Sequence, residues 1–308
     1  MPATARPTRV DELIDSRLMA KLDQVDVVSR KIFAGKLQGE RRSKRRGASV
    51  EFADYRHYAA GDDLRFVDWN IYARLDKLFL KMFLEEEDLS LLIVVDASAS
   101  MDSGDPDKFT FCQRLAMALG YIGLANHNRV TAWSFGGLGD SAGVQRLANL
   151  RGRRRTQELG QWLIGRVPGG PSGFDEAMRT IALARQGKGV MVILSDFFLK
   201  EGYEKGLRYL AGGGYDTFLI QVLSPQEFDP SKGGIVGDMK LVDCEDGDVA
   251  EITMTPALLR RYRETVDAYC GALRDFAVRR DMVQMTISSD LELDTLLMEY
   301  LRRRGLLR

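Results

Sequence analysis

The residues best placed to do chemistry follow the apolar run LLIVV. Asp96, Ser98 and Ser100 come directly after this run, each two residues apart. In an extended segment, side chains at such spacing point the same way, so one carboxylate and two hydroxyls converge. Oxygen donors suit a hard cation such as Mg²⁺, Mn²⁺ or Ca²⁺, whereas zinc prefers nitrogen or sulfur.

Two later segments add oxygen donors of the same kind. The apolar run VMVIL is followed by Ser195 and Asp196, and the Gly-rich loop GGPSG supplies Ser172. Ligand sites of open α/β sheets lie at the carboxyl ends of the strands, where these residues are expected. We therefore expect one divalent-cation site, Mg²⁺ first among the candidates, with two carboxylates and three hydroxyls as ligands, some through water.

The elements that must position these residues alternate between short apolar runs and helical patterns, which predicts an α/β fold with a mainly parallel sheet flanked by helices. Asp105 and Pro106 predict the start of a helix. The expected strands are 91–95, 130–135, 143–150 (antiparallel), 190–194, 218–223 and 282–287, and the longest expected helix is 256–280. An extra β-hairpin is expected near 226–255.

The first part of the chain predicts a helical arm. Apolar residues from Val10 to Ile32 recur at three- and four-residue steps, and the basic run Arg41–Arg46 follows them. We interpret that run as a solvated loop, with nucleic-acid binding as the alternative. The expected organisation is a helical arm and basic loop over 1–46, an upstream segment over 47–88 that packs on the core, and the main domain over 89–308.

Composition narrows the class of protein. The 308 residues carry 44 basic and 44 acidic side chains, and this zero net charge disfavours bulk nucleic-acid binding. The longest stretch without a charged residue, Leu115–Asn128, is shorter than the ~20 residues that span a bilayer. Three scattered cysteines and no secretory signal predict a reducing, cytoplasmic location without a membrane span.

The predicted ligands resemble the metal-ion-dependent adhesion site of von Willebrand factor type A domains. Residues Asp96 to Ser100 match the first element of that site, Asp-x-Ser-x-Ser, and Asp196 matches the third. Ser172 falls where that family usually has Thr. The resemblance implies a von Willebrand A-like (Rossmann-like) domain in which a Glu or Asp of a partner protein completes the metal coordination.

The upstream segment resembles a second pattern, that of the bacterial domain-of-unknown-function family number fifty-eight. The matching residues are Asp54, Tyr55, Arg56, Tyr58, Gly61, Asp62, Asp63, Arg65, Asp68, Trp69 and Asn70. The chain departs at His57 and Ala60, where family members often carry Pro. The motif predicts either an internal docking network with Trp69 as its buried anchor or a partner surface. The resemblance implies a MoxR-type AAA+ ATPase as partner, in chaperone-like maturation of a protein complex.

The favoured function is therefore non-enzymatic, metal-dependent protein recognition. The chain has no G-x-S-x-G elbow and no phosphate-binding G-x-x-x-x-G-K-[ST] loop. An aspartyl phosphotransferase would need a second acid where Ser98 stands. Metal-dependent phosphoester hydrolysis stays open as an alternative, because Asp196 could accept a proton.

Overall fold

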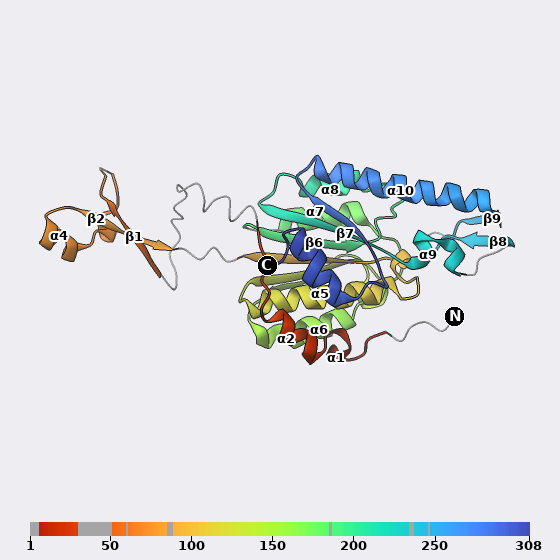
Figure 1. Ribbon diagram of the computed structural model, residues 1–308, viewed down its shortest axis with the longest axis horizontal. Coiled ribbons are helices and arrows are strands. Elements are labelled where there is room, and N and C mark those ends of the chain that lie inside the picture. Colours follow the sequence, from red (N-terminus) through yellow and green to blue (C-terminus); the bar gives the residue numbers. More distant parts are fainter. Residues whose placement is uncertain are drawn as a thin grey trace. The chain divides into compact units, whose positions relative to one another are not determined.

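The computed structural model (Figure 1) describes residues 6–29, 51–59, 61–84, 89–184, 187–233, 237–245 and 247–308. The chain divides into two compact units. Unit 1 combines Met1–Phe33 with Leu89–Arg308, and unit 2 comprises Ala34–Asp88. The basic run Arg41–Arg46, on which the nucleic-acid alternative depends, lies outside the described residues.

Unit 1 is built on a six-stranded sheet with the order β10-β7-β6-β3-β4-β5. The strands are β3 (Ser90–Ala97), β4 (Arg129–Gly136), β5 (Gln145–Leu150), β6 (Gly189–Ser195), β7 (Tyr215–Leu223) and β10 (Val283–Ser288). All neighbours pair in parallel except β4 and β5, which are antiparallel. The predicted α/β class, including its antiparallel strand, is confirmed.

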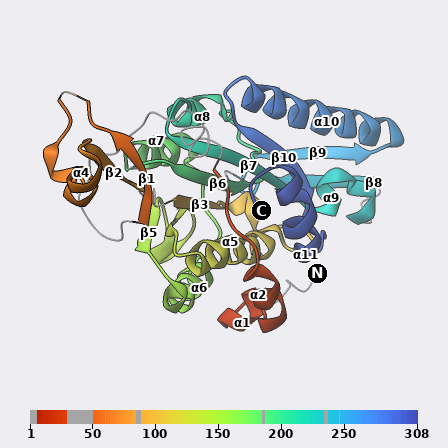
Figure 2. The ribbon, with the colours of Figure 1, turned by 60° about the vertical axis from the view of Figure 1, so that its left-hand side comes forward.

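Helices cover both faces of this sheet (Figures 1 and 2). They are α1 (Val10–Leu13), α2 (Ser16–Leu22), α5 (Lys108–Ala125), α6 (Thr156–Ile164), α7 (Phe174–Ala184), α8 (Glu204–Leu210), α9 (Pro225–Phe228), α10 (Pro256–Val278) and α11 (Leu293–Thr295), which runs into a π-helical turn at Leu296–Leu301. Short 3-10 turns lie at Ala99–Met101, Gly139–Ser141, Arg153–Arg155 and Pro230–Gly233.

The central strand β3 shows why the sheet needs two helical layers. Leu91, Ile93 and Val95 pack in one apolar cluster with α2, α5 and α6. Leu92 and Val94 belong to a second cluster with α7, α8 and α10. Because successive strand residues point to opposite faces, an uninterrupted apolar run is what a strand covered on both sides requires. All eight residues of β3 are buried.

The start of α5 differs from the expectation at Asp105 and Pro106. The helix begins at Lys108, and its N-cap is Asp107, whose carboxylate accepts a hydrogen bond from the Thr110 N–H at 2.7 Å. The helix therefore starts two residues later than the start predicted at Pro106. This shift places Lys108 in the first turn.

The N-terminal arm is helical only as far as Leu22. Beyond it, Val25, Val27 and Ser29 are buried at alternate positions, the period of a strand and not of a helix. Val27 forms a β-bridge with Leu307, so the arm pairs with the C-terminal end of the chain. The expectation of a helix continuing through this segment was wrong for Asp23–Ser29, and the rest of the predicted arm lies outside the described residues.

Two smaller sheets complete the fold. The predicted hairpin is confirmed as β8 (Gly237–Val242) paired antiparallel with β9 (Val249–Met254). Unit 2 pairs β1 (Glu51–His57) with β2 (Phe79–Leu84), and between these strands lie a 3-10 turn at Leu64–Phe66 and helix α4 (Trp69–Leu75).

Candidate metal site

The two strands that carry the predicted aspartates are neighbours in the sheet. Val95 of β3 lies opposite Leu194 of β6, so Asp96 and Asp196 follow on adjacent strands. From β3 the chain proceeds to β4 on one side, and from β6 to β7 on the other. The loops after β3 and β6 therefore diverge, and open α/β sheets bind their ligands in the crevice that such a divergence leaves.

Asp96 is fully buried and accepts hydrogen bonds on both carboxylate oxygens. The Ser98 hydroxyl donates to Oδ1 at 2.6 Å, and the Ser195 hydroxyl donates to Oδ2 at 2.6 Å. The Ser98 and Ser100 hydroxyl oxygens lie 3.1 Å apart. The structure thus brings together the Asp-x-Ser-x-Ser residues as the spacing predicted.

The environment of Asp96 opposes its negative charge. Burial, and then the nearby charge of Asp196, raise the pKa of Asp96 to about 7, although the hydroxyls of Ser195 and Ser98 lower it in part. A carboxylate buried beside a second carboxylate is stabilised by a cation. A divalent ion bound beside the two carboxylates would stabilise the charged form of Asp96.

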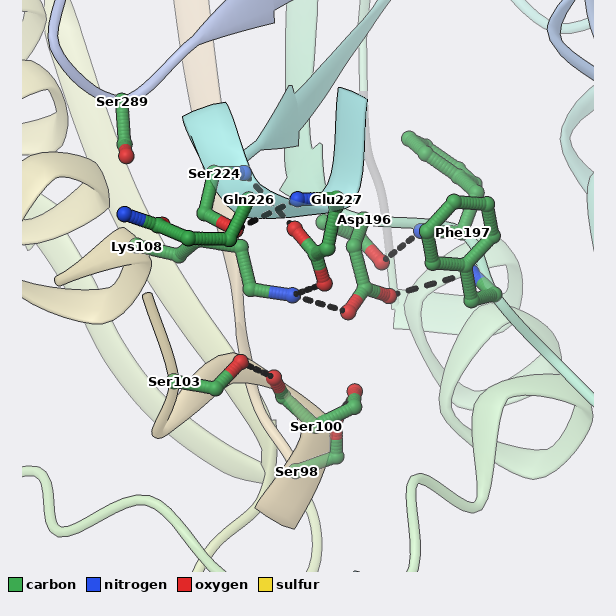
Figure 3. Close-up of polar contacts among 12 residues, drawn as sticks. Ser98, Ser100, Ser103, Lys108, Asp196, Phe197, Ser224, Gln226, Glu227 and Ser289 are labelled. Carbon is green, nitrogen blue, oxygen red and sulfur yellow. Dashed lines mark hydrogen bonds and ion pairs between the residues drawn. The ribbon is translucent and has the colours of Figure 1, made fainter. Parts of the chain in front are cut away.

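Asp196 is held by the buried side chain of Lys108, which the sequence analysis did not assign to the site (Figure 3). The Lys108 Nζ donates to Asp196 Oδ2 at 2.9 Å and forms a second ion pair with Glu227 of α9. The other oxygen, Oδ1, accepts a hydrogen bond from the Phe198 N–H at 3.0 Å. Both carboxylate oxygens of Asp196 are therefore engaged and fixed in position.

Lys108 remains charged in spite of its burial. Desolvation lowers its pKa, but the charges of Asp196 and Glu227 outweigh this and raise the pKa above the usual value. Two carboxylates, those of Asp196 and Glu227, then flank one ammonium. The site keeps an excess of negative charge that favours a further cation.

The Gly-rich loop is attached to the same edge by backbone hydrogen bonds. The Gly169 N–H donates to the Ala97 carbonyl at 2.9 Å, and the Ala99 N–H donates to the Gly170 carbonyl at 3.0 Å. Ser172, in this loop, is 7% exposed, and its hydroxyl has no hydrogen-bond partner among the described residues. A buried hydroxyl without a partner is costly, and it leaves an oxygen available as a ligand in a loop that is tied to the end of β3.

These donors fit a hard divalent cation by their chemistry. The set contains two carboxylates and three hydroxyls, and no nitrogen or sulfur. Among the described residues, no group of three or more His, Cys, Asp or Glu side chains is placed to hold a metal ion. A cation at this edge would therefore depend on the serine hydroxyls and on water for the rest of its coordination.

Two residues that sequence reasoning missed, Lys108 and Glu227, had recognisable signals. Lys108 is in helical phase with the buried Cys112 and Leu115, so its position on the core face of α5 was visible from the spacing. Glu227 completes a Ser-x-x-Glu capping box with Ser224. The pattern at Glu227 indicated only a helix start, and its contact with Lys108 required the fold.

The family motif of unit 2 forms a hydrogen-bonded network of its own. The Asp68 carboxylate caps α4 by accepting from the Asn70 N–H at 2.9 Å, and it also accepts from the Tyr55 hydroxyl at 3.2 Å. Two ion pairs join further residues of the motif, Arg56 with Asp62 and Arg65 with Asp63. Asp54 lies in β1, and Gly61 adopts a φ of +100°.

Trp69 is exposed within unit 2. Its side chain is 58% exposed on α4, beside Tyr72 with ring centroids 6.0 Å apart. Leu64, Phe66 and Leu75 are also about half exposed or more. Within unit 2, Asp68 and not the tryptophan is the buried residue of this motif, and the docking of Trp69 on the core stays a prediction.

The strand order, the divergence of the chain after β3 and β6 and the Asp-x-Ser-x-Ser loop define a von Willebrand A-like domain. The family described as "Protein of unknown function DUF58" matches residues 54–269, and the chain belongs to that family. The match includes the unit 2 motif and most of the sheet.

Similar proteins are uncharacterised. The proteins Rv1480 of Mycobacterium tuberculosis and Mb1516 of Mycobacterium bovis are each 28% identical over 265 residues, which cover 83% of this chain and 81% of the relative. Among solved structures, a von Willebrand factor type A protein of Catenulispora acidiphila is similar over 74% of this chain and 43% of its own, with 11% identity and a TM-score of 0.41.

A second solved structure is an aerotolerance-related membrane protein of Bacteroides fragilis. It is 13% identical, with a TM-score of 0.36, over 65% of this chain and 92% of its own. In the part of our chain that the structure describes, no helix is long and apolar enough to cross a membrane.

Proposed function

We propose that this protein is a divalent-metal-dependent protein-interaction module. One observation carries the proposal: the Ser172 hydroxyl is buried without a partner at the edge where Asp96, Ser98, Ser100 and Asp196 meet. Without a metal ion, among the residues that the structure describes, the Ser172 hydroxyl has no hydrogen-bond partner and the buried Asp96 carboxylate has no cation beside it. A bound Mg²⁺ would use both.

Each residue has a role that follows from its contacts. Ser98, Ser100 and Ser172 would offer neutral oxygens as ligands, while Asp96 supplies charge at the centre. Asp196 is fixed by Lys108 and by the Phe198 N–H, so it would hold a metal-bound water in a constant orientation. The metal would supply a Lewis-acidic position at the edge of the sheet. Mn²⁺ or Ca²⁺ could replace Mg²⁺ there.

The partner would be a protein that presents a Glu or Asp side chain. A carboxylate suits a position opposite a divalent cation, and binding would depend on both the metal and the shape of the surrounding loops. By family resemblance, we propose a MoxR-type AAA+ ATPase as this partner, with the module serving as its adaptor in chaperone-like maturation of a protein complex.

Recognition is favoured over catalysis because the base that hydrolysis would need is already engaged. Asp196 Oδ2 accepts a hydrogen bond from the buried Lys108 ammonium, and Oδ1 accepts one from a backbone N–H. Both oxygens of this carboxylate are therefore already occupied by hydrogen-bond donors. A metal-dependent phosphoesterase remains the alternative function, and it predicts turnover of a generic phosphoester.

Calorimetric titration of Mg²⁺ and Mn²⁺ into the protein tests the site. Asp96→Asn keeps the side-chain shape but removes the charge, and it is expected to abolish binding. Asp140→Ala, which removes an exposed aspartate after β4, is the matched control and should bind normally. Equal cation binding by the protein and by Asp96→Asn would refute the metal site.

Affinity capture tests the recognition step. The protein should retain a partner, the AAA+ ATPase in our proposal, from lysate of its own cells in Mg²⁺, and it should lose that partner with a chelator or with Asp96→Asn. Capture that survives both treatments would contradict metal-dependent recognition.

A further inference from the structure

The hairpin β8–β9 brings a carboxylate to the candidate metal site from outside the predicted motif. Its turn spans residues 243–248 and includes Glu245, which is half-buried. Glu245 Oε1 is buried and has no hydrogen-bond partner among the described residues. An acidic side chain on a hairpin turn would ordinarily point into water, so this burial needs a cause.

The surroundings of Glu245 place it beside the predicted ligands. The Ser172 backbone donates a hydrogen bond to the Glu245 carboxylate, and Asp196 lies near enough for its charge to act on that carboxylate. The carboxyl is therefore close to two of the five predicted ligands, in the loops after β6 and before α7. The Ser172 hydroxyl is also buried without a partner, so two buried oxygens in this region, one from Ser172 and one from Glu245, have no hydrogen-bond partner among the described residues.

The turn is fixed in this position by its own contacts. Lys200, in the loop after β6, forms ion pairs with Asp243 at 3.0 Å and Asp248 at 3.6 Å. Within the turn, the Asp243 carboxylate accepts a hydrogen bond from the Glu245 N–H at 2.8 Å. Figures 1 and 2 show β8 and β9 beside α9, the helix that carries Glu227 to the site.

We propose that Glu245 is an internal substitute for the partner's carboxylate. The hairpin turn presents it at the mouth of the site, where it stabilises a bound cation, directly or through a metal-bound water. A partner's Glu or Asp must then displace this turn before it can bind. The inference rests on the proposed function, because a site without metal would give Glu245 nothing to stabilise.

Mn²⁺ binding, followed by its paramagnetic resonance signal, tests this role. Glu245→Ala should weaken Mn²⁺ binding roughly tenfold, the effect expected of one carboxylate some ångströms from a divalent ion near the surface. Propionate, which carries the carboxylate that the variant lacks, should restore part of the affinity in Glu245→Ala and change nothing in the unaltered protein. Glu245→Gln, which keeps the shape, should weaken binding in the same way.

The control is Glu251→Ala, which removes an exposed carboxylate from β9 of the same hairpin. The proposal is overturned if Glu245→Ala binds Mn²⁺ as Glu251→Ala does, or if propionate restores nothing. Thermal unfolding shows that each variant is folded. If Asp96→Asn also binds Mn²⁺ normally, the metal site itself fails; if only Asp96→Asn loses binding, the role of Glu245 alone fails.

Discussion

Replacing Lys108 by methionine removes the ammonium that faces Asp196 and Glu227 but keeps a side chain of similar length. In the folded protein the Lys108 side chain has no exposed surface, and that of Asp196 is 1% exposed. The variant would therefore leave buried carboxylates without their nearest cation. We expect Lys108→Met to lower the free energy of unfolding of unit 1.

The expected loss follows from the burial of the pair. Removing one partner of a buried ion pair costs about 3–5 kcal/mol, because the remaining charge is left in a medium of low polarity. For a domain of this size, about 2–4 °C of melting temperature is lost per kcal/mol, so the midpoint should fall by roughly 6–20 °C. The matched control is Lys205→Met, because the Lys205 side chain is 69% exposed in its pair with Asp175. That variant should show little or no loss of stability, because exposed ion pairs contribute little.

Urea denaturation of both variants, with and without Mg²⁺, measures the difference. If the site binds metal, Mg²⁺ at a hundred times its Kd should return about 2.7 kcal/mol to a folded protein. This gain should be larger in Lys108→Met than in the unaltered protein at the same Mg²⁺ concentration, since the vacated charge strengthens cation binding. A loss below 1 kcal/mol, equal to that of Lys205→Met, would refute the reasoning about the buried pair.

Three further predictions concern the same edge of the sheet. The pKa of Asp96 in the folded protein, about 7, lies above its value in the unfolded chain. In the absence of metal, the free energy of unfolding should therefore fall as the pH rises from about 4 to 7. Asp96→Asn should remove this pH dependence in urea denaturation. Ser172→Ala should leave stability unchanged or raise it by about 1 kcal/mol, since the hydroxyl has no partner, yet weaken Mn²⁺ binding by calorimetry; equal binding would contradict its role. Gly136→Ala should reduce both melting temperature and Mn²⁺ binding, because a Cβ there would meet the Ser98 nitrogen at 2.6 Å and the φ is +75°; an unchanged variant would contradict this clash.

The sequence predicted those features that depend on local pattern. The uninterrupted apolar run before Asp96 indicated a strand covered on both faces, and the spacing of Ser98 and Ser100 indicated their convergence. The two hydroxyls do approach each other, but Ser100 lies in the 3-10 turn Ala99–Met101 and not in the extended segment expected. The strand itself follows from strand geometry, which needs no knowledge of distant contacts. The β8–β9 hairpin was visible for the same reason.

Features that depend on distant contacts could not be predicted in this way. The buried pair of Lys108 with Glu227 joins residues 119 apart in the chain, and neither local pattern requires it. The segment after Leu22 carries a helical spacing, but its pairing with Leu307 at the opposite end of the chain imposes an extended form. The exposure of Trp69 within unit 2 could not be predicted either, because propensity alone does not say which face of α4 lies outward.

The bridge between Val27 and Leu307 has a consequence for the integrity of the chain. Unit 2 is inserted between two segments of unit 1, and the segment before it is held by the buried Leu13 and Leu22 and by a backbone hydrogen bond from Arg308 to Asp26 at 2.9 Å. A single proteolytic cut within unit 2 would thus produce two polypeptides that remain one particle. They would separate only when unit 1 unfolds, so a nicked preparation would migrate as intact protein until it is denatured.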